Sequence, residues 1–360
     1  MVVTRPASPG ELAEVLATAA RGGRTVTPLG GGRASGMGEP TERPDIMLST
    51  DRLDRVIEHR PADLTITVEA GCRLEVLAER LREQGQFVAL DPYGGPGHTV
   101  GGVLAAGWSG PERLAFGATR DQVLGLTVAL PRFGLVRAGG RQLKNVSGYD
   151  MPRLHVGALG TLGVIVEVTL RVRPLPRRIS TLEVSPDSLA GALSAAERVL
   201  SMNMHPLAVL IAAAEDALKL LARYGGPGDA VGEAAAELGW NEADPQAWEQ
   251  IKRLRSDRWA RIAVPPCSLL ELLPLLEPAW LAEPGTGVVH WLNARNPAAV
   301  ARARGAAEES GGSLVLLAAP PPLRSSLGAW GSPPSTVGIM RRLWAGFDPD
   351  GTLSRRRSFV

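Results

Sequence analysis

Three consecutive glycines, Gly30, Gly31 and Gly32, follow a short run of β-forming residues and precede Arg33 and Ala34. Because glycine has no Cβ, such a loop can bring successive backbone N–H groups close to an anion, typically a phosphate. The loop lacks the Lys-Ser/Thr ending of a Walker motif, and its spacing differs from the dinucleotide fingerprint of a Rossmann fold. Taken alone, it is better explained as a tight turn between strands.

Two further glycine-dense segments favour a ligand-binding role for the loop over a simple turn. Residues 98–110 read HTVGGVLAAGWSG, and KNVSGYD at 144–150 leads into GALGTLGVI at 157–165. Each of the three segments adjoins a stretch that is typical of a β-strand. Loops of this kind fit one extended ligand that is wrapped by backbone groups, and a dinucleotide has both that length and two adjacent phosphates.

The elements that position these loops can be predicted from the pattern of apolar residues. Ser8-Pro9-Gly10-Glu11 predicts a helix start with a Ser cap, and Gly22-Gly23 predicts its end. Further helices are expected at 73–84, 186–201, 229–238, 268–276, 297–309 and 335–346. Strands are expected at 24–29, 65–71, 123–131, 162–172, 180–184, 207–212, 217–224, 258–264, 287–292 and 313–318. The alternation of polar and apolar residues at 65–71 predicts that this strand is half-buried. Pro174 and Pro176 indicate a domain boundary, and 320–335 reads as a linker.

The glycine motifs resemble the FAD-binding domain of the vanillyl-alcohol oxidase / p-cresol methylhydroxylase (PCMH) family. More narrowly, residues 90–126 and 144–165 resemble the FAD-binding E subunit of bacterial glycolate oxidase, and RRLWAGFDPDG at 341–351 resembles its C-terminal helix and turn. The resemblance is dense over 1–176, thin over 177–335, and present again at the end of the chain.

The resemblance implies an α+β fold in three parts. Residues 1–176 would form a PCMH-type FAD-binding domain of two subdomains. Residues 177–334 would form a smaller α+β cap domain, and their order of strands and helices predicts an antiparallel sheet with helices on one face. Residues 335–360 would return to the FAD domain as a helix and tail.

The resemblance also implies which residues contact the FAD. The first loop would hold the pyrophosphate, and the later segments would run beside the pyrophosphate, the ribityl chain and the flavin. The residues carried over are Gly30, Gly31, Gly32, Arg33 and Ala34; Thr99, Val100, Gly101 and Gly102; Gly107, Ser109 and Gly110; and Gly160, Gly163 and Ile165.

Some positions depart from the family pattern. Covalent flavoproteins of this family often place a His in the first loop, where this chain has Arg33, so noncovalent FAD is expected. Arg33 could pair with a phosphate or be a surface side chain, and the sequence favours neither. His98 stands where the related subunit usually has Ala, and a solvent-facing loop position is the preferred interpretation over a flavin contact.

No catalytic residue can be selected from the sequence. Oxidation of a 2-hydroxy acid needs a cation for the substrate carboxylate and a group that takes the hydroxyl proton. None of the five histidines shows a metal-ligand spacing, so no metal is predicted, and two histidines of the cap are interpreted as strand-end or core-edge residues: His205 and His290. Four cap residues could face substrate, and their spacing distinguishes none of them: Arg258, Arg261, Arg295 and Trp291.

Composition limits the class of partner. The net charge of +2 over 360 residues argues against nucleic acid. The sequence shows neither a signal-peptide core nor an apolar run long enough to span a bilayer, so a cytoplasmic protein is expected. Attachment at the inner face of the cell membrane through partners stays open.

Three functions remain at this point. The first is the FAD-binding subunit of a glycolate (2-hydroxy acid) oxidase complex, whose partners would be a D-type flavoprotein catalytic subunit and an iron–sulfur subunit. The second is a self-sufficient FAD-dependent alcohol or hydroxy-acid oxidoreductase. The third is a non-catalytic scaffold that keeps the flavin fold. The resemblance favours the first, with little turnover by the isolated chain.

Overall fold

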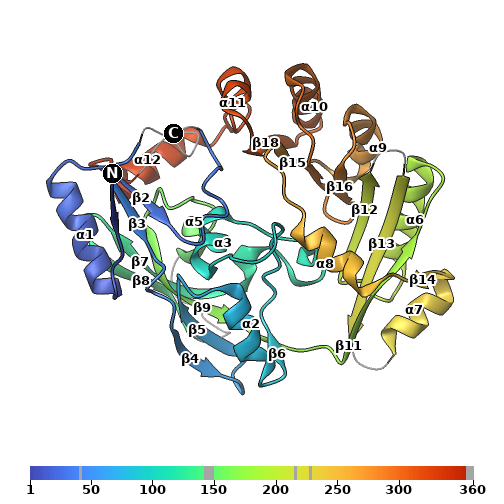
Figure 1. Ribbon diagram of the computed structural model, residues 1–360, viewed down its shortest axis with the longest axis horizontal. Helices are drawn as coiled ribbons and strands as arrows, with labels where there is room; N and C mark the ends of the chain where they lie inside the picture. Colours follow the sequence, from blue (N-terminus) through green and yellow to red (C-terminus); the bar gives the residue numbers. More distant parts are fainter. Residues whose placement is uncertain (40–42, 142–149, 215–216, 227–228, 354–360) are drawn as a thin grey trace. The chain divides into compact units, whose positions relative to one another are not determined.

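The computed structural model describes residues 1–39, 43–141, 150–214, 217–226 and 229–353 (Figure 1). These divide into two compact units. Unit 1 comprises 1–109, 118–175 and 332–360, and unit 2 comprises 110–117 and 176–331. Most of the KNVSGYD motif, residues 144–149, and the arginines near the C-terminus, 355–357, lie outside the described residues.

Unit 1 opens with a three-stranded parallel sheet in the order β1-β3-β2, covered by helix α1. The predicted cap is confirmed, because the Glu11 N–H donates to Ser8 Oγ at 3.2 Å. The apolar face of α1, including Leu12 and Leu16, packs in one core with Leu48 of the sheet. The bounds are β1 Val2–Thr4, α1 Pro9–Arg21, β2 Val26–Leu29 and β3 Ile46–Ser49.

The second sheet of unit 1 is antiparallel, in the order β4-β5-β9-β7-β8, and a separate core joins it to helices α2 and α3. The short strands β6 and β10 pair with each other. The bounds are β4 Val56–Arg60, β5 Thr65–Glu69, α2 Leu74–Arg82, β6 Gln86–Phe87, α3 Val100–Ala106, η1 Thr119–Gln122, β7 Val123–Leu130, β8 Gly134–Gly139, α5 Pro152–His155, β9 Val164–Arg171 and β10 Arg173–Pro174.

Strand β5 differs from the half-buried strand that its alternation predicts, because all five of its residues are buried. On the polar side, Thr67 Oγ1 lies 2.9 Å from Thr169 Oγ1, and the Glu69 carboxylate is paired with Arg55 at 2.8 Å. Polar side chains that are satisfied by one another can be buried at little cost. Alternation of polar and apolar residues therefore does not identify a solvent-facing side here.

The C-terminal part of the chain packs within unit 1. Helix α12, Val337–Phe347, is followed by a turn in which the Leu353 N–H donates to Asp348 Oδ2 at 2.7 Å. The Val26 N–H of β2 donates to the Thr352 carbonyl, also at 2.7 Å. This places the end of the chain beside the strand that leads into the glycine loop.

Unit 2 contains an eight-stranded antiparallel sheet in the order β14-β11-β13-β12-β16-β17-β15-β18, as the cap pattern predicts. The bounds are β11 Arg178–Val184, β12 Ala208–Ala214, β13 Ala217–Gly226, β14 Asn241–Glu242, β15 Trp259–Ala263, β16 Trp280–Glu283, β17 Val288–Trp291 and β18 Ser313–Ala318.

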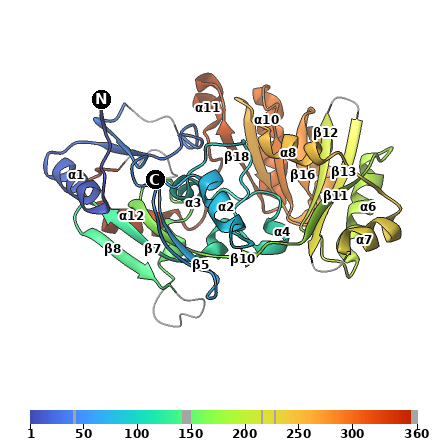
Figure 2. The same ribbon diagram turned by 60° about the horizontal axis from the view of Figure 1, so that its bottom comes forward.

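Most helices of unit 2 share one core with one face of this sheet, and Figure 2 shows α6 and α7 on the same side of it. The prediction that all helices lie on one face is wrong, because Trp248 of α8 packs with Leu210 and Leu221 on the other face. The predicted linker is also partly wrong, since it contains helix α11. The bounds are α4 Arg113–Phe116, α6 Leu189–Ser201, α7 Ala230–Leu238, α8 Pro245–Arg253, η2 Pro266–Ser268, α9 Leu269–Leu272, η3 Leu273–Leu275, α10 Pro297–Glu309 and α11 Pro321–Leu327.

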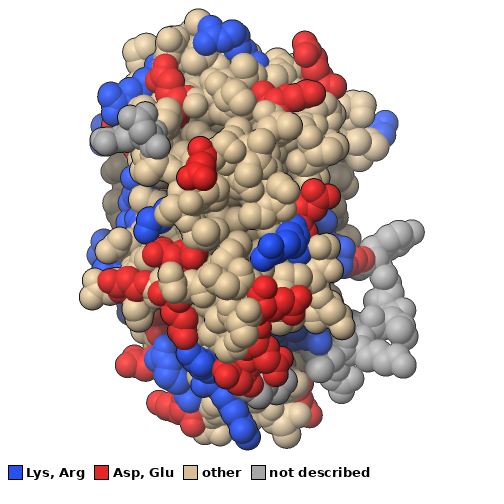
Figure 3. Space-filling model, turned by 90° about the vertical axis from the view of Figure 1, so that its right-hand side faces the viewer, with Lys and Arg blue, Asp and Glu red and all other residues tan. Residues whose placement is uncertain are grey.

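Charged residues on the surface shown in Figure 3 are of both signs and lie interspersed. This agrees with the near-balance of 39 basic and 37 acidic residues in the sequence. Within the part of the chain that the structure describes, no helix has the length and apolar character needed to cross a bilayer.

His155 in unit 1 gives the protein a specific sensitivity to acid. The ring is buried and packs edge-on against Phe347 of α12, with 5.5 Å between ring centroids. Burial lowers the pKa of His155 from 6.5 to about 4. Between pH 6.5 and pH 4 this histidine is therefore protonated in the unfolded chain and neutral in the folded chain. Its contribution to the free energy of unfolding is fully present above pH 6.5 and is lost as the pH falls toward 4.

As the pH falls from 7 to 4, we expect the depressed pKa of His155 to lower the free energy of unfolding by roughly 3 kcal/mol. Urea unfolding of the wild type and of His155→Gln across this range measures the effect, because the carboxylates titrate alike in both. The exposed His205, changed to Gln, is the control. If the difference in unfolding free energy between the wild type and His155→Gln stays constant with pH, the lowered pKa of His155 is contradicted.

Candidate functional site

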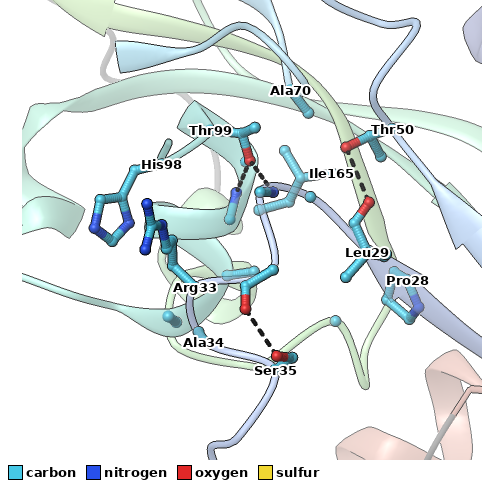
Figure 4. Close-up of a pocket in the computed structure, with 18 of the residues that line it drawn as sticks. Pro28, Leu29, Arg33, Ala34, Ser35, Thr50, Ala70, His98, Thr99 and Ile165 are labelled. Atoms are coloured by element: carbon cyan, nitrogen blue, oxygen red, sulfur yellow. Dashed lines mark hydrogen bonds between the residues drawn. The ribbon is translucent and has the colours of Figure 1, made fainter. Parts of the chain in front are cut away.

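A cavity in unit 1 is lined by the three glycine-dense segments that the sequence analysis singled out (Figure 4). The first loop contributes residues 28–35, the segment around α3 contributes 98–108 in part, and the segment before β9 contributes 159–165 in part. Thr50, after β3, and Ala70, after β5, complete the lining. Segments far apart in the sequence thus meet around one space.

Thr99 joins the first loop to helix α3. Its Oγ1 accepts hydrogen bonds from the Gly31 N–H at 3.3 Å and from the Gly102 N–H at 3.2 Å, as the dashed lines in Figure 4 show. The second bond makes Thr99 the N-cap of α3. Because one hydroxyl serves both the loop and the helix, the side chain fixes the loop against the helix start.

We expect Thr99→Val to lower the unfolding free energy of the protein by about 1–2 kcal/mol, since two N–H groups lose their acceptor. Thr99→Ser keeps the oxygen and should remain within about 0.5 kcal/mol of the wild type. Chemical denaturation of the flavin-free protein compares the two variants. A loss for Ser as large as the loss for Val would contradict the role of the hydroxyl, because Ser keeps that oxygen.

In the part of the chain that the structure describes, the first loop presents backbone donors without a recorded acceptor. Among the described residues, no hydrogen-bond acceptor is recorded for the N–H groups of Gly30, Gly32, Arg33 and Ala34. Polar backbone groups in half-buried positions normally have partners, so a run of open donors is typical of an anion-binding loop.

The charge of the lining also suits an anion. Among the described residues that line the cavity, Arg33 and His98 are ionisable and none is an Asp or Glu. The Arg33 guanidinium donates to the Pro96 carbonyl, which holds the side chain at the cavity and not out in solvent. The sequence left the position of Arg33 open between a phosphate partner and a surface residue.

His98 is buried, with 4% of its surface exposed, so the prediction of a solvent-facing loop residue is wrong. Its Nε2 donates to the Tyr93 carbonyl at 3.0 Å, and its ring packs edge-on against Trp108 with 5.6 Å between centroids. The preceding glycine-rich turn folds back over the ring, which one sequence position could not reveal. His98 and Trp108 thereby form an aromatic wall of the cavity.

Ten of the fifteen residues predicted to contact the cofactor line this cavity. They are Gly30, Gly31, Gly32, Arg33, Ala34, Thr99, Gly101, Gly102, Gly160 and Ile165. They come from β2 and its loop, from the start of α3, and from the segment that leads into β9. The fold therefore gathers them as the resemblance implied.

The other five residues lie outside the lining, each for a structural reason. The Val100 side chain is part of the core beneath α3. Gly107 ends α3 with φ +61°, Ser109 Oγ lies 3.0 Å from Thr119 Oγ1, and Gly110 belongs to unit 2. A Cβ on Gly163 would come within 2.4 Å of Val128, so this glycine serves the packing of β9 on β7.

Several lining residues were missed by sequence reasoning. They are Pro28, Leu29, Ser35, Thr50, Ala70, Ala105, Ala106, Trp108, Leu159 and Val164. Trp108 stands between two predicted contacts, and Ala105 and Ala106 precede them, so proximity in the sequence was an available signal for these three. Thr50 and Ala70 follow buried strands at a distance from the motifs, and only the fold brings them here.

The arrangement fits FAD. The open N–H groups of the first loop and Arg33 suit a diphosphate, and the apolar and aromatic wall suits a ring system. Comparison with known proteins gives the same class: residues 1–139 match the family model described as an FAD binding domain. The cofactor predicted from the sequence, FAD, is thereby confirmed.

Two curated relatives are informative. The chain is 34% identical over 176 residues to the mitochondrial D-lactate dehydrogenase [cytochrome] of Arabidopsis thaliana, which covers 49% of this chain and 31% of the relative. It is 34% identical over 199 residues to the glycolate oxidase subunit GlcE of Escherichia coli K12, covering 55% of each chain. The chain thus spans about a third and about half of the length of these relatives.

A solved structure confirms the fold class over nearly the whole chain. An alkyldihydroxyacetonephosphate synthase superposes with a TM-score of 0.73, covering 97% of this chain and 76% of that one at 18% identity. At this identity the likeness establishes the fold alone. The predicted α+β architecture with a large antiparallel sheet is therefore confirmed.

Proposed function

We propose that this protein is the noncovalent FAD-binding subunit of a complex that oxidises a 2-hydroxy acid such as glycolate. The observation that carries the proposal is the glycine loop, whose open N–H groups and Arg33 line one cavity with an aromatic wall. When bound, FAD would accept two electrons from the alcohol carbon of the substrate. The similarity to a subunit named for glycolate oxidase supports the substrate class and the complex.

The first loop would hold the diphosphate of FAD by its backbone N–H groups, with Arg33 adding positive charge. Thr99 would keep the loop in place, and His98 with Trp108 would exclude water from one side of the cavity. Position 33 is an arginine, which does not tether flavin. His98 Nε2 already donates to a backbone carbonyl, which also supports a cofactor held without a covalent bond.

Acid denaturation tests the noncovalent attachment. After denaturation and ultrafiltration of the purified protein, we expect the yellow flavin in the filtrate in an amount equal to the protein. Colour retained with the polypeptide would refute noncovalent binding. The same sample gives the FAD content, so the two questions are answered together.

The partners we propose are a D-type flavoprotein catalytic subunit and an iron–sulfur subunit, with attachment to the membrane only through them. Dye reduction under glycolate measures this. We expect the isolated, FAD-loaded chain to turn over slowly or not at all, and the set of three subunits to reduce dye rapidly. Equal rates for the isolated chain and the full set would contradict the subunit assignment.

A second candidate function is a self-sufficient FAD-dependent oxidoreductase of hydroxy acids. The similarity to a D-lactate dehydrogenase favours it, because that relative is named for an activity and not as a subunit. Equal rates in the dye assay are the result that this function requires.

A further inference from the structure

Residues 97–101, which we call the bridging segment, lie between two other parts of unit 1. On one side the segment runs antiparallel to residues 70–75, which connect β5 to the start of α2. Three backbone hydrogen bonds of 2.8–3.0 Å join the two stretches: Leu74 N–H to the His98 carbonyl, Val100 N–H to the Cys72 carbonyl, and Gly101 N–H to the Ala70 carbonyl. The segment is therefore attached to the sheet and to α2 along its length.

On its other side the bridging segment contacts the first glycine loop. Thr99 Oγ1 accepts the Gly31 N–H, and a Cβ on Gly31 would come within 2.1 Å of the Gly97 carbonyl oxygen. The Arg33 guanidinium donates to the Pro96 carbonyl, and a Cβ on Gly97 would lie 3.0 Å from Arg33 Nη2. The position of residues 96–99 thus decides where the loop and the Arg33 side chain lie.

The chain that leads into this contact is a turn rich in glycine. Gly94, Gly95 and Gly97 have φ values of +103°, +73° and +93°, a backbone region that few other residues adopt. Glycine loses more conformational freedom on folding than any other residue, so such a turn depends on its contacts to keep one conformation. A bond that holds the end of the turn therefore also holds the residues that meet the first loop.

Glu75 supplies a bond of this kind from α2. Its Oε1 accepts the Gly97 N–H at 2.8 Å, and the carbonyl of the same Gly97 is the atom that touches Gly31. Glu75 is the second residue of α2, and its side chain is exposed. It lies outside the lining of the cofactor cavity. One side chain on a helix therefore fixes the residue on which the loop rests.

Electrostatics alone would make a glutamate an unfavourable choice at this place. Its carboxylate stands one residue before His98, which lines the cavity, and a negative charge near the cavity repels a diphosphate. By this effect alone, removing the charge would keep or strengthen FAD binding. The hydrogen bond to Gly97 has the opposite consequence, so the direction of change in a variant distinguishes the two effects.

We propose that Glu75 is a positioning residue for FAD, which holds the bridging segment, and through it Arg33 and the first loop, in the conformation that receives the diphosphate. The inference rests on the proposed function in one respect, the assignment of the diphosphate to the first loop. Without the bond to Gly97, a smaller fraction of molecules holds the loop in this conformation. The apparent affinity for FAD falls by that fraction.

Titration of the flavin-free full chain with FAD and with riboflavin, in Glu75→Ala and Glu75→Gln, tests the proposal. Alanine removes the acceptor, whereas glutamine removes the charge and keeps an acceptor oxygen. We expect Glu75→Ala to weaken FAD about five- to tenfold and Glu75→Gln to stay within about twofold of the wild type. Riboflavin, which lacks the diphosphate, should bind both variants within about twofold of the wild type.

Glu79→Ala is the matched control. Glu79 is also exposed and lies one turn further along α2, so its removal changes the net charge equally and should leave FAD affinity within about twofold. Wild-type affinity in Glu75→Ala, or a loss in Glu75→Gln as large as in Glu75→Ala, would overturn the proposal. An equal loss for riboflavin would also overturn it, because general damage to the fold weakens both ligands.

The same titrations separate this inference from the proposed function. If the wild type binds FAD no more tightly than riboflavin, the first loop does not hold the diphosphate and the proposed function loses its basis. If the wild type prefers FAD and Glu75→Ala shows the same preference, the function stands and the positioning role is refuted. At saturating FAD the three-subunit set with Glu75→Ala should reduce dye at the wild-type rate, because Glu75 acts on affinity; a lower rate at full flavin occupancy would contradict this.

Discussion

Ala34→Glu should lose FAD, with at least about a hundredfold weaker binding than the wild type. Ala34 is half-buried in the cavity lining, directly after Arg33, and its N–H is one of the open donors of the loop. A carboxylate at this position would stand close to the diphosphate, and two like charges about 4 Å apart repel by roughly 4 kcal/mol in a partly shielded site. Flavin absorbance per protein after gel filtration, and FAD titration, measure the loss.

Ala17→Glu is the matched control for this variant. Ala17 is also half-buried in unit 1, but it lies on α1, outside the cavity lining. Both variants introduce the same charge and bulk, so a difference in FAD retention reports the place of the charge. If Ala34→Glu keeps the flavin content of Ala17→Glu, the first loop does not hold the diphosphate.

Gly31→Ala should damage both the loop and FAD binding, although it adds a single methyl group. A Cβ on Gly31 would come within 2.1 Å of the Gly97 carbonyl oxygen, a backbone atom that cannot move aside. The loop would have to leave Thr99, and the bond from the Gly31 N–H would be lost. We expect about 3 kcal/mol of lost unfolding free energy, as for overpacking against a rigid neighbour.

Gly10→Ala adds the same methyl group in α1, where its nearest contact would be Ser8 Oγ at 3.9 Å, and should leave both properties intact. Urea unfolding and flavin content, measured side by side, compare the two. A Gly31→Ala protein as stable as Gly10→Ala would contradict the close approach of the loop to residues 97–99.

The same geometry corrects a simple expectation for glycine loops. One expects a bulky or charged residue at Gly31 or Gly101 to fill the space of the cofactor and leave the fold intact. A Cβ on Gly101 would instead come within 2.6 Å of the Ala70 side chain. Both glycines are required by contacts inside the protein, so Ala34, which tolerates a side chain already, is the better position for testing the cofactor.

Elements that depend on residues near one another in the sequence could be predicted. Ser8 caps α1 because its hydroxyl accepts a hydrogen bond from the Glu11 N–H, a contact within one turn of the chain. The apolar side chains of β9 are buried because burial removes them from water. Helix α3 was missed because two glycines in seven residues oppose a helix by about 1 kcal/mol each. The helix is kept by its Thr99 cap and by the burial of Val100 and Leu104.

Long-range pairing limited the rest. Strand β16 has four residues and no alternation of its own, and it forms because β12 and β17 flank it. The burial of Glu283, which ends β16, likewise depends on the neighbouring strands. Spacing alone could not distinguish Arg261 from Arg258, whereas the structure pairs Arg258 with Asp257 and places Arg261 across from His290.

The central claim is that the cavity of unit 1 binds FAD through the diphosphate, and titration of the flavin-free protein with FAD and with riboflavin tests it most directly. Riboflavin carries the same ring system without the diphosphate and adenosine. Quenching of flavin fluorescence reports both bindings. We predict that FAD binds stoichiometrically and at least about a hundredfold more tightly than riboflavin. Equal affinities, or no binding of FAD, would contradict the account.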